Sequence, residues 1–236
     1  FGKSLLLSTF KAYFQGKKEL FEGLAIEKME TEWNEYPVLH LDLNAEKYDS
    51  SEKLHEILSR QLSQWELQYG KGIDENTLSG RFAGVIYRAY EQTGQQVVVL
   101  VDEYDKPMLQ AIGNEDLQKQ FRDTLKPFYG ALKTMDGCIK FALLTGVTKF
   151  GKVSVFSDLN NLKDISMDER FVDICGITEK EIHDNLEEEL HQLAEKQKMS
   201  YEQVCAELKE CYDGYHFVEH TIGIYNPFSL LNTFDK

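Results

Sequence analysis

The sequence has few of the residues that cross-link or stiffen a chain. Among 236 residues there are four cysteines and four prolines, and no two cysteines have the C-x-x-C spacing of a zinc or redox site. We therefore expect ordinary thiols, a reducing compartment and a cytoplasmic protein. No segment approaches the ~20 consecutive apolar residues of a bilayer-spanning helix, so we expect no membrane segment. The cysteines are Cys138, Cys175, Cys205 and Cys211.

Basic residues are also scarce. The chain has 26 Lys and Arg against 40 Asp and Glu, which gives a formal net charge of −14. A surface that holds nucleic acid by its phosphates carries an excess of basic side chains, so we do not expect this chain to bind nucleic acid directly. What the sequence does have is a globular composition, with 42% hydrophobic and 12% aromatic residues. Its length suits one large domain, with or without a small appendage.

Short apolar strands alternate with amphipathic helices along most of the chain. This alternation predicts an α/β fold in which helices cover both faces of a parallel sheet. One helix follows Ser4 and closes near Gly16. The other predicted helices are 46–69, 75–92 and 115–134, and the predicted strands are 36–44, 97–101 and 138–147.

The pattern changes after residue 172. Two helical segments follow with no predicted strand between them, so we divide the chain into a core, 1–172, and a helical lid-like region, 173–236. Thr178, followed three residues later by Glu181, predicts a capping box at the start of the first of these helices.

The strongest chemical signal is the segment VVVLVDEYDKP at 97–107. A buried strand that ends in Asp102 and Glu103 places two carboxylates at the carboxyl edge of the sheet, where open parallel sheets bind ligands. In P-loop nucleotidases the first acid helps to hold Mg²⁺ and the second activates the attacking water, so we assign these roles to Asp102 and Glu103. A later apolar strand ends at Thr145, where AAA-type ATPases place a residue that senses the γ-phosphate. For a bare strand end, the alternative is a pair of solvated acids.

The chain opens with Gly2-Lys3-Ser4, the second half of a phosphate-binding loop. The full motif, G-x-x-x-x-G-K-[ST], lies between a strand and a helix, and we expect that strand and the first glycine to precede Phe1. In this role Lys3 neutralises the β- and γ-phosphates, Ser4 gives its hydroxyl to Mg²⁺, and the amides from Gly2 onward face the phosphates at the helix N-terminus. The tripeptide alone also occurs by chance.

Two other charged residues have two interpretations each. Asp105 lines the nucleotide site, or it belongs to a turn before Pro107. Arg170 acts as an arginine finger towards a neighbouring subunit, or it forms a surface ion pair, which we favour.

Two further pairs lie late in the chain. Lys149 and Lys152 lie in a connector that contacts a nucleotide or a partner. His216 and His220 have the spacing of metal ligands on a helix, but they follow a turn-like segment without a third ligand, so we expect no metal there.

Segments along nearly the whole chain, especially VVVLVDEYDKP and LLTGVTKFGKVSVFSDLNN, resemble predicted AAA-ATPase-like proteins of Bacteroidetes and other anaerobic bacteria. The resemblance implies a P-loop NTPase three-layer sandwich of the additional-strand, catalytic-glutamate branch, with a C-terminal helical or winged-helix-like lid. In full-length members it also implies a following PD-(D/E)XK nuclease-like domain. No D…E-x-K pattern of that kind follows residue 175 in this sequence.

We therefore expect a protein that binds ATP and hydrolyses it with Mg²⁺, and whose turnover drives or regulates an attached domain. Two alternatives stay open. The first is a nucleotide-binding switch or scaffold with negligible turnover, and the second is a regulatory ATPase module of a DNA-processing nuclease. The sequence leaves the oligomeric state open.

Overall fold

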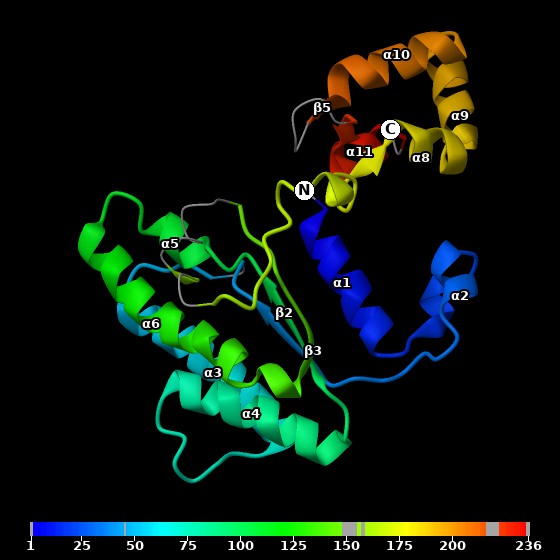
Figure 1. Ribbon diagram of the computed structural model, residues 1–236. Coiled ribbons are helices and arrows are strands. Elements are labelled where there is room, and N and C mark those ends of the chain that lie inside the picture. The colour runs from blue at the N-terminus through cyan, green and yellow to red at the C-terminus, as the bar shows by residue number, and fades with distance from the viewer. Residues whose placement is uncertain (1, 45, 148–154, 157–158, 216–221, 235–236) are drawn as a thin grey trace. The chain divides into compact units, whose positions relative to one another are not determined.

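The computed structural model describes residues 2–44, 46–147, 155–156, 159–215 and 222–234 (Figure 1). The chain divides into two compact units, of which one is Leu7–Leu162 and the other joins Phe1–Leu6 to Lys163–Lys236. The division into 1–172 and 173–236 stays a prediction.

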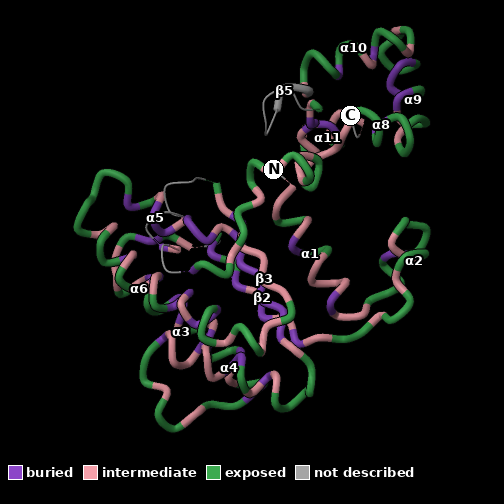
Figure 2. Tube along the Cα trace, viewed as in Figure 1, coloured by how far each residue is buried: buried purple, intermediate pink, exposed green. Residues whose placement is uncertain are grey.

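A parallel three-stranded sheet forms the centre of the unit Leu7–Leu162. Its order is β1 (Val38–Asp42), β2 (Val97–Asp102) and β3 (Ile139–Leu144), with β2 in the middle. Both neighbours run parallel to β2, as the alternation of strands and helices predicts. All six residues of β2 are buried, which Figure 2 shows as a purple core. The predicted α/β fold with a parallel sheet is therefore confirmed.

Helices cover both faces of this sheet. Successive side chains of β2 point to opposite faces, and all of them are apolar up to Val101, so both faces need a covering layer. On one face Val98 and Leu100 pack with Leu7 and Phe14 of α1 (Lys3–Phe14). The opposite face packs against three longer helices, as Figure 1 shows. These helices are α3 (Ser51–Tyr69), α4 (Leu78–Thr93) and α6 (Glu115–Thr134).

Side-chain caps explain where the three longer helices begin. Ser50 accepts a hydrogen bond from the amide of Lys53, so α3 begins at Ser51 and not at residue 46 as predicted. Thr77 and Asn114 cap α4 and α6 in the same way. The short elements of this unit are η1 (Lys18–Phe21), α2 (Ala25–Met29), α5 (Lys106–Gln110) and η2 (Asp136–Cys138).

Helix α1 runs antiparallel to the strands. Its last residue, Phe14, accepts a hydrogen bond of 2.8 Å from the amide of Tyr36, just before β1 begins at Val38. The C-terminal end of α1 therefore lies beside the start of β1. Because the segment Leu7–Phe14 crosses the sheet from there, Leu7 lies nearer than Phe14 to the carboxyl edge of the strands.

The second unit contains the helices α8 (Glu179–Asn185), α9 (Glu187–Gln197), α10 (Tyr201–Tyr212) and α11 (Pro227–Phe234), with the short η3 (Glu169–Phe171). Thr178 and Glu181 form the predicted capping box at the start of α8. A small antiparallel sheet, β4 (Ile177–Thr178), β6 (Ile224–Tyr225) and β5 (Asp213–Tyr215), was not predicted. Its strands have only two or three residues, too few to show an alternating pattern. In the described parts of the chain, no helix is long and apolar enough to cross a membrane.

Candidate functional site at the carboxyl edge of the sheet

Two polar side chains meet where β2 and β3 end. Asp102, the last residue of β2, is 4% exposed, and Thr145, just beyond β3, is 9% exposed. The hydroxyl of Thr145 donates a hydrogen bond of 2.6 Å to Oδ1 of Asp102. The structure therefore brings together two of the residues that the sequence singles out, one from each of two neighbouring strands.

Backbone hydrogen bonds hold this pair in place beyond the ends of the strands. The amide of Thr145 donates to the carbonyl of Val101 at 2.8 Å, and the amide of Tyr104 donates to the carbonyl of Thr145 at 2.9 Å. The ladder between β2 and β3 thus continues one step past Leu144. A carboxylate and a hydroxyl fixed in this way are positioned before any ligand arrives.

Glu103 follows Asp102 in an unusual backbone conformation. Its φ is +53°, in the left-handed region that residues other than glycine adopt rarely. Its carbonyl accepts from the amide of Lys106 at 2.9 Å, which closes a turn into α5. Such strain is more common at functional sites than elsewhere. The turn breaks the alternation of the strand, so that Glu103 leaves the direction of β2 while Asp102 stays in the sheet.

Asp105 ties this turn to the segment after β3. The side chain is fully buried, and the amide of Val147 donates to its Oδ2 at 3.0 Å and its Oδ1 at 3.2 Å. A Cβ on Gly146 would lie 2.7 Å from Oδ1 of Asp105, so the fit depends on glycine. The structure shows that Asp105 connects the turn after β2 to the segment after β3. The predicted turn before Pro107 is the start of α5.

Asn44 also belongs to this edge, and the sequence interpretation missed it. Lys106 Nζ donates to Oδ1 of Asn44 at 3.3 Å, and the amide of Asn44 donates to Oδ1 of Asp42 at 2.8 Å. Asp42 lies opposite Asp102 in the register of β1 and β2. The available signal was that Asn44 ends the predicted strand 36–44, as Asp102 and Glu103 end the next predicted strand.

His40 is a second residue that the sequence interpretation missed. It lies two residues before Asp42 on the strand and therefore on the same face of the sheet. Its Nε2 is buried and has no hydrogen-bond partner among the described residues. Burial and the nearby charge of Lys11 lower the pKa of His40, while Asp42 and Asp102 oppose that change.

Gly2, Lys3 and Ser4 belong to the other compact unit. Gly2 has a φ of +77°, and a Cβ there would lie 2.9 Å from the amide nitrogen of Gly176 of the same unit. Lys3 and Ser4 are the first two residues of α1, as the motif requires for the helix that follows the loop. Lys3 is half-buried and Ser4 is exposed.

Arg170 lies in an exposed ion pair. Its Nε and NH2 donate to the carboxylate of Asp168 at 2.8 Å and 2.5 Å, and this pairing holds the pKa of Asp168 well below its usual range. This geometry agrees with the favoured interpretation as a surface ion pair. Lys149, Lys152, His216 and His220 lie outside the described residues.

A parallel sheet with an acid and a hydroxyl at its carboxyl edge fits a P-loop-like AAA domain. Residues 1–156 match the family described as "Predicted AAA-ATPase", and the chain belongs to this AAA-ATPase-like family. Membership supports nucleotide binding and a general ATPase role.

One relative extends well beyond this chain. An uncharacterized protein in the vnfD 5′ region of Azotobacter chroococcum mcd 1 is 35% identical over all 236 residues. The chain spans 43% of the length of that relative. No solved structure matches the chain.

Proposed function

We propose that this chain binds ATP and hydrolyses it in a Mg²⁺-dependent reaction. Glu103 orients and deprotonates the attacking water, and Thr145 responds to the γ-phosphate. Lys3 neutralises the phosphates, and the amides from Gly2 onward receive them at the positive end of α1. Phosphoryl transfer needs mainly positioning and charge neutralisation, which such residues supply.

The buried pair of Asp102 and Thr145 carries this proposal. The carboxylate of Asp102 accepts a hydrogen bond from the hydroxyl of Thr145, which follows the neighbouring strand. This bond couples two residues that would otherwise act independently. The direction of α1 gives independent support, because the segment Leu7–Phe14 runs antiparallel to the strands with its N-terminal end towards this edge. The strained turn at Glu103 gives further support.

The donor atoms also fit Mg²⁺. No group of three or more His, Cys, Asp or Glu side chains suited to a metal occurs within the described ranges. Mg²⁺ in nucleotide sites is held by one or two protein oxygens together with phosphates and water, so it does not require such a group. Asp102 and the hydroxyl of Ser4 are oxygen donors of this kind, and bound Mg²⁺ would neutralise charge on the phosphates.

We further propose that turnover drives or regulates an attached domain, with a nuclease-like domain as the candidate, and that the C-terminal unit acts as a lid. The relative from Azotobacter, of which this chain spans 43%, motivates this part of the proposal. A nucleotide-binding switch with negligible turnover is the alternative, because the same residues serve both.

Two substitutions test the assignment in the full-length protein. We expect Glu103→Gln to keep ATP affinity and to lower turnover by about two orders of magnitude, because it removes the general base. We expect Lys3→Ala to weaken ATP binding itself. The control is Glu91→Gln, which changes an exposed carboxylate of α4.

Equilibrium binding of ATP and single-turnover hydrolysis are measured for each variant. Hydrolysis at the parental rate by Glu103→Gln would show that the catalytic assignment is wrong. Absence of turnover in the parent, with ATP binding intact, would favour the switch.

A further inference from the structure

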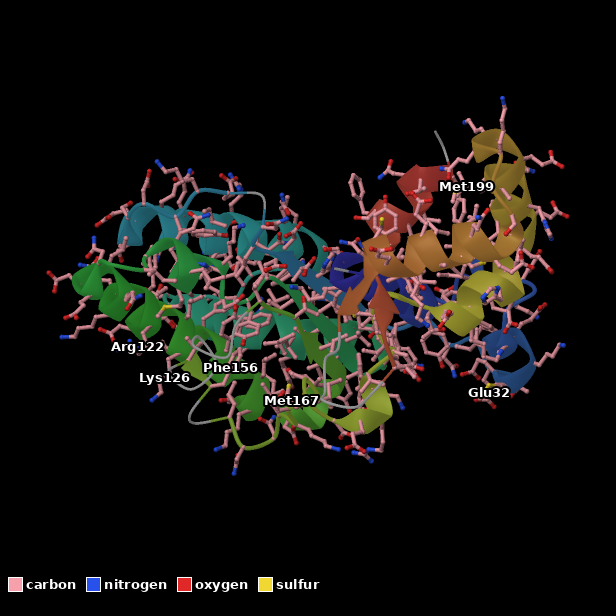
Figure 3. All side chains as sticks on the ribbon, turned by 90° about the horizontal axis from the view of Figure 1, so that it is seen from above. Glu32, Arg122, Lys126, Phe156, Met167 and Met199 are labelled. Carbon is pink, nitrogen blue, oxygen red and sulfur yellow. The ribbon has the colours of Figure 1, made fainter. Side chains whose placement is uncertain are left out.

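A cavity of about 340 Å³ lies at the end of the unit Leu7–Leu162 opposite the candidate site. Its walls come from the end of α1, from the segment between α2 and β1, and from the start of β3. Tyr36 and Lys140 lie near the first residues of β1 and β3, whereas Asp102 and Thr145 lie at the far ends of β2 and β3. Figure 3 shows Glu32, which lines this cavity, far from Arg122 and Lys126 of α6.

Four aromatic side chains line the cavity, and their rings pack against one another. The rings of Tyr13 and Trp33 meet edge to face, with centroids 5.7 Å apart. The ring of Tyr36 meets that of Phe14 edge to face at 5.8 Å. Faces of such rings attract cations through their quadrupole.

Two carboxylates line the same cavity. Tyr13 donates from its hydroxyl to Oε2 of Glu30 at 2.5 Å, and the amides of Thr31 and Glu32 donate to Oε1 of Glu30 at 2.9 and 3.0 Å. These hydrogen bonds lower the pKa of Glu30, and the bond to Glu30 raises the pKa of Tyr13 to about 12. Glu30 is thus held as an anion, and the side chain of Glu32 is exposed beside it.

Lys140 shows that a ring of this cavity already receives a cation. Its Nζ lies 5.8 Å from the centroid of the Tyr36 ring. The side chain points there because of an irregularity in β3: Val97 pairs with Ile139 and Val98 pairs with Phe141, which leaves Lys140 as an extra residue. Bulges of this kind re-aim a side chain. With two carboxylates against one ammonium group, the cavity keeps a negative balance.

We propose that this cavity binds the guanidinium group of an arginine side chain from a basic peptide or protein. Guanidinium groups stack on aromatic faces and pair with carboxylates, and the cavity provides both. The net charge of −14 on the chain favours a basic partner. The walls of the cavity are formed before a ligand binds. The amide of Tyr36 donates a hydrogen bond to the carbonyl of Phe14, and Gln15 forms an antiparallel β-bridge with Glu35.

The test uses the 236-residue chain and two small probes. Trp33 and Trp65 are the two tryptophans of the sequence, so Trp65→Phe leaves Trp33 as the fluorescent reporter within the cavity. We expect saturable quenching by N-acetyl-arginine amide and none by N-acetyl-citrulline amide, which has the same shape without the charge. Calorimetric titration of the unaltered chain gives a second measurement if Trp65→Phe disturbs folding.

Matched variants identify the groups responsible. At low ionic strength we expect Glu32→Gln to weaken arginine binding about threefold and Lys140→Met to strengthen it about threefold, as for exposed charge pairs. Glu19→Gln changes an exposed carboxylate outside the cavity and should leave arginine binding unchanged.

Equal binding of the citrulline probe, or the absence of saturable binding, would overturn the proposal. Weaker arginine binding by Lys140→Met would also overturn it, because the Lys140 ammonium group would then support the bound probe and not repel it, and tighter binding of tetramethylammonium would exclude guanidinium as the preferred group. None of these results depends on ATP hydrolysis.

Discussion

At the scale of single residues, the candidate site is defined by what each polar group contacts. Asp102 and Asp105 lie three residues apart and are both buried, yet one accepts from the hydroxyl of Thr145 and the other from the amide of Val147. The difference follows from the turn at Glu103, whose φ of +53° separates the directions of the two side chains. The side chain of Asp102 thus lies in the candidate site at the edge of the sheet, whereas that of Asp105 holds the turn after β2 in place.

His40 gives a prediction for the dependence of stability on pH. Burial lowers its pKa in the folded protein below the ordinary value of 6.5, so the unfolded chain takes up the proton first as the pH falls. The contribution of His40 to stability is therefore fully present above pH 6.5 and declines below it. The surrounding charges are those of Lys11, Asp42 and Asp102.

We expect the free energy of unfolding of the parent protein to decrease between pH 6.5 and the pKa of folded His40, and His40→Gln to show a smaller decrease. Urea unfolding across this pH range measures it. His55→Gln, at an exposed position of α3, serves as the control and should keep the parental slope. An unchanged slope in His40→Gln would contradict the prediction.

At the scale of elements, polar and aromatic contacts fix the helical layer on the far side of the sheet. Arg81 of α4 donates two hydrogen bonds to Glu66 of α3, at 2.7 and 2.8 Å, and further ones to Ser59 and Ser63. The ring of Phe82 stacks on that of Phe128 of α6 with centroids 4.7 Å apart. Register between these helices therefore does not depend on apolar packing alone.

The pair of Arg81 and Glu66 gives a prediction for stability. The two side chains are 12% and 8% exposed, so removing one partner leaves a charge that water screens weakly. We expect Arg81→Ala to lower the free energy of unfolding by about 3 kcal/mol. Chemical denaturation measures it, with Lys180→Ala as the control.

Lys180 pairs with Asp184 on the exposed surface of α8, where side-chain exposures are 83% and 53%, so we expect its loss to have little effect. Equal effects of the two substitutions would show that burial does not determine the strength of these pairs.

At the scale of the whole molecule, the chain has separate hydrophobic cores. The largest core fills the space between the sheet and α3, α4 and α6, and a smaller cluster lies under α1. A third core belongs to the C-terminal unit and is formed around Leu190, Val204 and Leu230. Separate cores allow the two units to unfold independently.

We therefore expect two thermal transitions. Leu190→Ala removes a fully buried side chain from the C-terminal core, and it should lower the midpoint of one transition only. Leu58→Ala, equally buried in the largest core, should lower the midpoint of the other. Scanning calorimetry of both variants provides the measurement, and a single transition that both substitutions shift equally would contradict the prediction.

Local patterns were sufficient for the major elements. The helix 115–134 was predicted with the bounds of α6, because Asn114 caps its start and the apolar spacing continues to its end. The strands 97–101 and 138–147 were located because their apolar runs are continuous. The start of α3 was predicted too early because the apolar face begins only at Leu54 and does not mark the first turn, which capping by Ser50 fixes.

The sequence by itself determined that a buried strand leads directly into Asp102 and Glu103 and that a helix follows the Gly2-Lys3-Ser4 segment, because periodicity and capping depend on neighbours in the chain. Only the tertiary structure decided that Thr145 bonds Asp102, that Asp105 holds Val147, and that Lys140 lies over Tyr36. Each of these contacts depends on the register between segments distant in sequence, and a single-residue shift such as the bulge at Lys140 changes which face a side chain occupies.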